Sequence, residues 1–190
     1  MPGPVFIEGD RIELRTIEEE DIEFFTRARN HPEVRRHIHV FRTPRSVTRE
    51  AKTFFENAEE TDDKASFLVC ADDERVGSVR LSPIVDTRRW ANLAYWIEPD
   101  HQSDGYAMEA CELVVEYGFE ELRLHRISAV TMAPNTASRR LLERLDFTHE
   151  GTKRESAFAE GEHVDEEQYG LLETEWRERR EQRNESRSAP

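Results

Sequence analysis

Cysteine is scarce in this chain of 190 residues, with Cys70 and Cys111 as the two examples. Both lie within apolar segments, so we interpret them as small buried side chains in a reducing compartment and exclude a disulfide-stapled fold. Long apolar runs are also missing, and no segment approaches the ~20 residues that a membrane-spanning helix needs. Residues 1–4 lack a basic region followed by an apolar run, so no secretory signal is expected. These absences predict a soluble, cytoplasmic protein.

Lysine is the second shortage. The chain holds Lys52, Lys64 and Lys153, and arginine supplies the rest of its 27 basic residues. Against 41 acidic residues the formal net charge is −14, which disfavours contact with nucleic acid or anionic lipid and attracts protonated amines. An acidic, lysine-poor composition predicts a halophile with an acidic proteome, in which high salt screens the self-repulsion. An ordinary acidic protein of a mesophile is the alternative.

Hydrophobic periodicity is present, and it predicts a folded domain although the hydrophobic and charged fractions are both 36%. Strands are expected at 10–15, 65–71, 75–81, 90–97, 126–131, 147–158 and 163–172, and helices at 16–30, from 43–46 to about 58, at 107–122 and at 134–145. This order predicts an α+β fold, with a mixed sheet flanked by helices. A single domain is expected over 1–176. The charged and polar residues 177–190 predict a disordered tail.

A turn between an expected strand and an expected helix is the first candidate for chemistry. Its sequence is Gln102-Ser103-Asp104-Gly105-Tyr106-Ala107. Backbone N–H groups at a helix N-terminus have no intrahelical partner and can hold phosphate oxygens, and a glycine lets the ligand approach closely. The alternative is that Ser103 or Asp104 only caps the helix. The turn alone favours neither interpretation.

A second segment, 132–147, favours the phosphate site. It reads Met132-Ala133-Pro134-Asn135-Thr136-Ala137-Ser138-Arg139-Arg140-Leu141-Leu142-Glu143-Arg144-Leu145-Asp146-Phe147 and lies between two expected strands. Together with residues 10–15, 30–34, 165–170 and 175–176, it resembles the GNAT superfamily of acyl-CoA N-acyltransferases, in the branch that contains the ribosomal-protein N-terminal acetyltransferases. The resemblance covers nearly the whole chain, and the order and spacing of its motifs are more specific than any one motif. It implies a mostly antiparallel sheet with splayed central strands.

The resemblance implies sites for the co-substrate acetyl-CoA. The residues that match the pyrophosphate loop are Gln102, Ser103, Gly105, Tyr106 and Ala107. Asp104 lies within the same loop and is also assigned to the cofactor site. Those that match the strand beside the pantetheine arm are Tyr95, Trp96 and Ile97. This strand splays from its neighbour, 127–131, and one of its main-chain N–H groups would polarise the thioester carbonyl.

Two polar residues of the segment 132–147 match functional positions of the family. Asn135 matches a residue that contacts the pantetheine, and Ser138 matches the position that returns a proton to the departing thiolate. As alternatives, Asn135 is only a helix N-cap and Ser138 a neutral helix residue.

The sequence departs from the family in its loop. Ser103 and Asp104 stand where glycine and a basic residue are usual, and a carboxylate beside the pyrophosphate should weaken binding unless it points outward or salt screens it. Asp146 replaces the glycine of a Leu-Gly-Phe turn, which affects the turn more than the chemistry.

The general base has two candidates in the sequence. Proximity to the cleft indicates Glu98, with Glu109 as a second candidate, although each is also typical of a surface charge. Many relatives carry a glutamate where this chain has Asn92.

A basic island at 35–42 contains His37 and His39. The histidine spacing does not match a metal site, so no metal is expected. In the resembling family this segment lies near the entrance for the acceptor. A solvated connection between two helices is the alternative.

These inferences predict an N-acetyltransferase that moves an acetyl group from acetyl-CoA to a primary amine in a ternary complex, without a covalent enzyme intermediate. The expected acceptor is a protein N-terminal α-amine, with a small amine as the second choice, and the expected assembly is a monomer or homodimer. The alternative is a noncatalytic module that keeps the fold and senses acyl-CoA or a partner protein.

Overall fold

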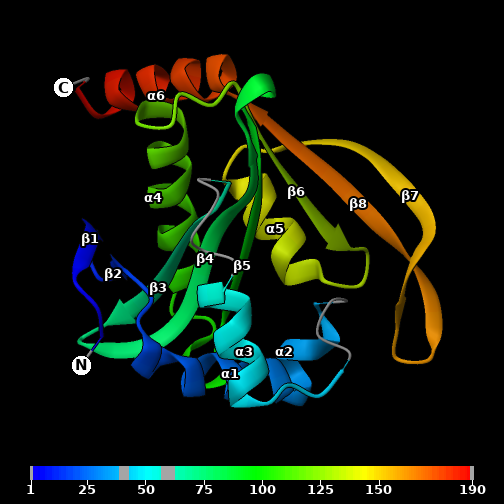
Figure 1. The fold of residues 1–190 in the computed structure, drawn as a ribbon. Coiled ribbons are helices and arrows are strands. Elements are labelled where there is room, and N and C mark those ends of the chain that lie inside the picture. Colours follow the sequence, from blue (N-terminus) through cyan, green and yellow to red (C-terminus); the bar gives the residue numbers. More distant parts are fainter. Residues whose placement is uncertain (1, 39–42, 57–62, 189–190) are drawn as a thin grey trace.

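The structure is a computed structural model that describes residues 2–38, 43–56 and 63–188. Its strands are β1 (Val5–Glu8), β2 (Glu13–Arg15), β3 (Ala65–Ala71), β4 (Glu74–Val85), β5 (Trp90–Ile97), β6 (Arg126–Met132), β7 (Thr148–Ala159) and β8 (Glu162–Leu172). Its helices are α1 (Ile22–Asn30), α2 (Pro32–Arg36), α3 (Val47–Ala51), α4 (Tyr106–Glu120), α5 (Thr136–Arg144) and α6 (Glu173–Ser188), as drawn in Figure 1.

The strands form one sheet in the order β1-β2-β3-β4-β5-β6-β8-β7. Every neighbouring pair is antiparallel except β5 and β6, which are parallel. A parallel pair needs a crossover, and α4 lies in the connection between β5 and β6. The predicted α+β fold, with a mixed and mostly antiparallel sheet flanked by helices, is confirmed.

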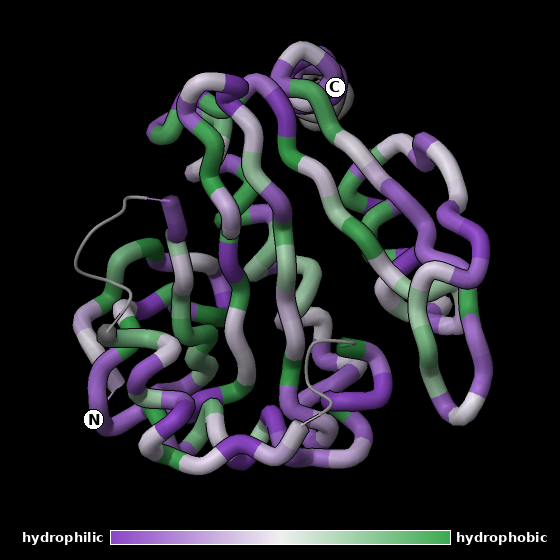
Figure 2. The backbone as a smooth tube through the Cα atoms, turned by 45° about the vertical axis from the view of Figure 1, so that its right-hand side comes forward, coloured by the Kyte–Doolittle hydropathy of each residue, from purple (hydrophilic) through white to green (hydrophobic). Residues whose placement is uncertain are grey.

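The parallel pair separates along its length. Its ladder joins Trp90–Leu93 of β5 to 126–129 of β6 and extends no further. On the outer sides, β4 still pairs with Ile97 of β5, and β8 pairs with Met132 of β6. The two halves of the sheet therefore diverge beyond Leu93, as Figures 1 and 2 show, and the predicted splay of the central strands is confirmed.

The two faces of the sheet carry different cores. On one face, fully buried Val79 and Leu81 of β4 belong to the same apolar cluster as Val114 of α4. On the other face, α1 contributes a smaller cluster in which Phe24 packs 5.4 Å from the ring of Trp96. Because side chains alternate along a strand, β3 supplies both layers, with Phe67 and Val69 in the larger cluster and Leu68 and Cys70 in the smaller one.

Both cysteines are buried and free, as predicted. Burial raises the pKa of Cys70 to about 11 and that of Cys111 well above its ordinary range. Neither thiol is therefore a ready nucleophile. Within the described ranges, no helix has the length and apolar character needed to cross a membrane.

The expected helix near residues 43–58 begins as predicted at its later candidate start. Ser46 caps α3, and its Oγ accepts a hydrogen bond of 3.3 Å from the N–H of Arg49. A turn of π-helix over Lys52–Glu56 continues the segment. The expected end near Ala58 lies outside the described residues.

The C-terminal segment differs from the disordered tail expected at 177–190. In the structure α6 is helical from Glu173 to Ser188. The Trp176 ring packs 5.4 Å from that of Phe119, and Arg180 pairs with Glu116 at 2.6 Å. One aromatic side chain and ion pairs to α4 hold this helix in place of an apolar stripe. Hydrophobic periodicity therefore could not predict the helix from the sequence.

Gly77 controls how closely β4 approaches β5. A Cβ at this position would collide with the carbonyl oxygen of Trp96 and lie 2.6 Å from Cδ1 of Ile97. Since the first of these atoms belongs to the backbone, β5 itself would have to shift.

We expect Gly77→Ala to lower the free energy of unfolding by about 1–3 kcal/mol because of this overpacking. Gly118→Ala is the matched control, since its Cβ would meet the flexible ends of Ile127 and Leu81 at 3.0 Å. Urea unfolding of both variants measures the difference. An equal loss of stability in the two would contradict the role given to Gly77.

Candidate active site

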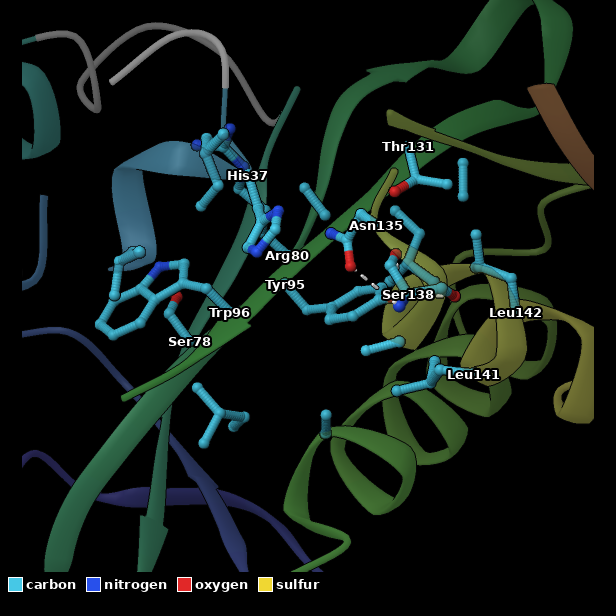
Figure 3. Close-up of a pocket in the computed structure, with 18 of the residues that line it drawn as sticks. His37, Ser78, Arg80, Tyr95, Trp96, Thr131, Asn135, Ser138, Leu141 and Leu142 are labelled. Atoms are coloured by element: carbon cyan, nitrogen blue, oxygen red, sulfur yellow. Dashed lines mark hydrogen bonds between the residues drawn. The ribbon is translucent and has the colours of Figure 1, made fainter. Parts of the chain in front are cut away.

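A cavity of about 860 Å³ passes through the opening between β5 and β6. This volume lies within the range of cavities that bind small molecules and cofactors. Of the predicted cofactor residues, those that line it are Tyr95, Trp96, Ile97, Gln102, Ser103, Gly105, Tyr106, Ala107 and Asn135. Ser138 lines it as well, and α1 and α2 close its other side through Arg29, Glu33 and His37, among others. Figure 3 shows the central part of this cavity.

The turn before α4 has the form of an anion-binding helix end. Gly105 is the N-cap residue, with φ 87°, and no side chain caps the helix. The predicted alternative, a cap formed by Ser103 or Asp104, is therefore wrong. Ser103 also has a left-handed backbone, with φ 75°. Because no side chain caps this end, its N–H groups stay available to phosphate oxygens.

Two further contacts fix this turn. The Nε2 of Gln102 donates a hydrogen bond of 3.1 Å to the carbonyl oxygen of Ile97, which ties the loop to the splayed end of β5. The Arg11 guanidinium donates through Nη1 to the carbonyl oxygen of Asp104 at 2.8 Å. Asp104 is not among the residues that line the cavity. Arg11 thus supplies a cation beside a loop that lacks the family's usual basic residue.

Asn135 and Ser138 lie one turn apart at the start of α5. Asn135 is the N-cap, and its Oδ1 accepts a hydrogen bond of 3.1 Å from the N–H of Ser138. The capping role weighed from the sequence is therefore present, and it leaves the Nδ2 group of the same side chain as a donor. Since Asn135 also lines the cavity, capping and ligand contact are compatible.

The hydroxyl of Ser138 forms a pair that the sequence did not predict. Its Oγ lies 2.7 Å from the hydroxyl of Tyr95, and either group can donate (Figure 3). Burial raises the pKa of Tyr95 far above its ordinary value, so its hydroxyl stays protonated at physiological pH. The two hydroxyls can therefore pass a proton toward the cavity.

The structure does not bring Glu98 to this site. Its carboxylate pairs with Arg27 at 3.6 Å and borders a separate depression beside Asp72 and Asp73. The second candidate base, Glu109, accepts hydrogen bonds from the backbone N–H of Arg11 at 2.8 Å and from its Nε at 3.1 Å. Glu98 is not among the residues that line the cavity, and its role as general base stays a prediction.

The carboxylates that line the cavity, among described residues, are Glu33 of α2 and Glu166 of β8. The basic island contributes His37, whose pKa is lowered by burial and by the neighbouring charge of Arg36. His39 lies outside the described residues. In the part of the chain that the structure describes, no group of three or more histidine, cysteine or acidic side chains could hold a metal ion.

Arg80 is a lining residue that sequence reasoning missed. It occupies β4 between the buried residues Val79 and Leu81, so simple alternation turns it to the opposite face of the sheet. That alternation was visible in the sequence. What the sequence did not reveal is that this face borders the cavity.

Comparison with known proteins agrees with this geometry. Residues 11–148 match the family model described as "Acetyltransferase (GNAT) domain". The N-acetyltransferase p20 of Bacillus licheniformis is 29% identical over 172 residues, which covers 88% of this chain and 96% of that protein.

Two solved structures share the fold. A Vibrio cholerae spermidine N-acetyltransferase in complex with CoA and spermine has a TM-score of 0.81 and 24% identity, over 87% of this chain and 98% of that chain. RimL, a ribosomal L7/L12 α-N-protein acetyltransferase in complex with CoA, has a TM-score of 0.81 and 17% identity, over 89% and 98%. The chain therefore belongs to the GNAT acetyltransferases and is an acyl-CoA-dependent N-acyltransferase.

Proposed function

We propose that this enzyme transfers an acetyl group from acetyl-CoA to a protein N-terminal α-amine by direct attack in a ternary complex. The observation that carries the proposal is the continuous cavity through the β5–β6 opening. Uncapped amides of α4 border one part of it, and α1 with α2 borders another. The two substrates can therefore meet from different sides of the sheet.

Acetyl-CoA enters from the side of α4. Its pyrophosphate accepts hydrogen bonds from the amides of the loop 102–107, and Arg11 adds positive charge nearby. The pantetheine arm extends along residues 95–97 of β5, where pairing with β6 has ended. Nδ2 of Asn135 donates to this arm, because its Oδ1 is already used in capping α5.

The chemistry needs no covalent enzyme intermediate. The neutral amine attacks the thioester carbonyl, and a main-chain N–H of β5 stabilises the oxyanion. The C–N bond forms and the C–S bond breaks as the tetrahedral intermediate collapses. The thiolate then takes the proton of Ser138 Oγ, which Tyr95 replaces through their 2.7 Å contact. The ammonium loses one proton to water before the attack. The second proton, which the nitrogen loses as the amide forms, returns through water to Tyr95 and restores the hydroxyl pair.

An α-amine suits a site without an assigned base. Its pKa of about 8, against about 10.4 for a lysine side chain, gives a larger neutral fraction near pH 7. RimL supports a protein acceptor, whereas the spermidine enzyme of Vibrio cholerae supports a small amine. The noncatalytic alternative would bind acetyl-CoA but acetylate no amine.

The first test combines binding with turnover. Isothermal titration should detect acetyl-CoA binding, and mass spectrometry should detect acetylation within a panel of peptides, amino acids and polyamines in low and high salt. Peptides with a free N-terminus should be the better substrates, and N-terminally blocked peptides that contain lysine should be poor ones. Binding without turnover of any amine would favour the noncatalytic module.

The second test addresses the hydroxyl pair. We expect Ser138→Ala to lower kcat by about 10²-fold, because the departing thiolate loses its proton donor. The backbone N–H that Asn135 caps remains, so the Kd for CoA should stay nearly constant. Thr136→Ala, at an exposed position of the same helix, is the matched control. An undiminished kcat in Ser138→Ala would remove Ser138 from the mechanism.

The third test addresses charge and salt together. Asp104→Lys should tighten CoA binding severalfold at low ionic strength, and the gain should shrink in molar salt, where the Debye length falls to about 3 Å. Glu162→Lys makes the same charge change at the tip of the β7–β8 hairpin and should have little effect. A Kd that Asp104→Lys leaves unchanged at every salt concentration would show that this carboxylate does not influence the cofactor.

A further inference from the structure

Arg80 lies on the face of the sheet that α1 to α3 cover. In the sheet register it stands opposite Ser66 of β3 and Ala94 of β5. Its neighbour on the same face, Ser78, stands opposite Trp96, whose ring packs against α1. Figure 3 shows the guanidinium in the cavity, in the space between His37 and Tyr95. The side chain therefore points to where an acceptor would approach.

Its charge is not neutralised by a direct contact. Among the residues that the structure describes, no hydrogen bond or ion pair engages the Arg80 guanidinium. Glu50 is the carboxylate whose charge acts on it, and Glu50 is fully buried with an oxygen 2.8 Å from Nε of Arg29. One carboxylate thus faces three guanidinium groups, those of Arg29, Arg45 and Arg80.

The lining of the cavity contrasts with the rest of the chain. The chain carries a net charge of −14, yet among the residues that the structure describes the cavity is bordered by more cations than carboxylates. The cationic residues are Arg29, Arg80, Arg140, Arg144 and Lys153, and the carboxylates are Glu33 and Glu166. Arg29 and Arg80 border the side of α1 and α2, and the other three lie on α5 and β7.

CoA phosphates do not account for Arg80. The loop that receives the pyrophosphate follows the end of β5 at Ile97, whereas Arg80 is opposite Ala94, three residues earlier. Arg80 also lies on the face opposite to Tyr95, since adjacent residues of a strand point to opposite faces. Its available donors are therefore on the acceptor side of the thioester.

We propose that Arg80 binds a carboxylate of the acceptor, and that the substrate is a peptide N-terminus with aspartate or glutamate at its first or second residue. The inference rests on the proposed function and specifies its substrate. Paired strands lie about 4.8 Å apart, so Arg80 is one strand spacing from the strand that polarises the thioester. A carboxylate within two residues of the amine spans that spacing, and a guanidinium binds it in a fork geometry.

The same charge disfavours polyamines. Spermidine carries its remaining positive charges near the reacting amine. On this side of the cavity they would meet Arg29 and Arg80, with Glu33 as the one carboxylate among the described lining residues there. The acceptor preference of this chain is therefore expected to differ from that of the spermidine N-acetyltransferase whose fold it shares.

The test compares peptides that differ at one position. Wild-type enzyme is assayed with otherwise identical peptides that carry Glu, Gln or Lys at the second residue, and with free glutamate and spermidine. We expect kcat/KM for the Glu peptide to exceed that for the Gln peptide by about tenfold, as for one charge-assisted hydrogen bond, with the Lys peptide and spermidine lower still. Equal values for the Glu and Gln peptides would overturn the proposal.

Variants of Arg80 connect the preference to this side chain. In Arg80→Gln the ratio of Glu to Gln peptide should fall to about one, and Arg80→Lys should restore part of it because the charge returns. Arg88→Gln, at an exposed arginine that does not line the cavity, should keep the wild-type ratio. A ratio that survives in Arg80→Gln would place the carboxylate site elsewhere. Circular dichroism checks that each variant is folded.

The outcomes also distinguish a failure of the Arg80 proposal from a failure of the proposed N-terminal acetylation. Turnover of all peptides at similar rates would leave N-terminal acetylation intact and remove only the role of Arg80. Turnover of free glutamate in preference to every peptide would overturn the peptide acceptor. A complete lack of turnover with bound acetyl-CoA would overturn the proposed function itself.

Discussion

The end of parallel pairing between β5 and β6 is the constraint on which the site depends. The ladder stops after Leu93 and Ala129, although both strands continue and remain paired on their outer sides. Main-chain groups on the inner edges are thereby released from the sheet. A ligand can use them only because the cavity follows the same opening, with the uncapped end of α4 beside it. Gly77 lets β4 approach β5 closely and so helps to fix the position of β5. That position matters to both the fold and the chemistry.

Charge divides the molecule into an acidic exterior and a basic cavity. The net charge of −14 attracts protonated amines over long distances, whereas Arg80 is the residue that we propose to bind the acceptor at short range. Long-range attraction is screened by salt, but interactions in a partly buried cavity are screened less. An acidic chain can therefore gather amines and still select, at the site, those that carry a carboxylate.

Much of the fold and cofactor side could be predicted from sequence because the signals are local. The helix at 107–122 and the strand at 90–97 follow clear periodicities, and the loop between them has its turn residues in order. The function of the loop 102–107 was ambiguous because the sequence also allows Ser103 or Asp104 to cap the helix. The backbone geometry, with Gly105 as the N-cap, excludes that cap. The pairing of Glu98 with Arg27, just before the turn at Pro99, depends in the same way on geometry that the sequence does not specify.

The missed features depend on contacts between distant segments. β1 is a short edge strand whose pairing with β2 gives little periodicity, and α6 is held by Trp176 and ion pairs to α4. An arginine in a strand is usually interpreted as a surface residue, so Arg80 was overlooked. Its position in the cavity follows from its pairing with β3 and β5 and from the cover that α1 to α3 provide. The 2.7 Å contact of Tyr95 with Ser138 likewise joins residues 43 positions apart.

The central claim is that amine and thioester meet directly in the opening between β5 and β6. Initial velocities measured while both substrates are varied test it most directly. Intersecting double-reciprocal lines, with no acetyl group on the enzyme after incubation with acetyl-CoA alone, are the predicted result. Parallel lines together with an acetylated enzyme would show a covalent intermediate and contradict the account.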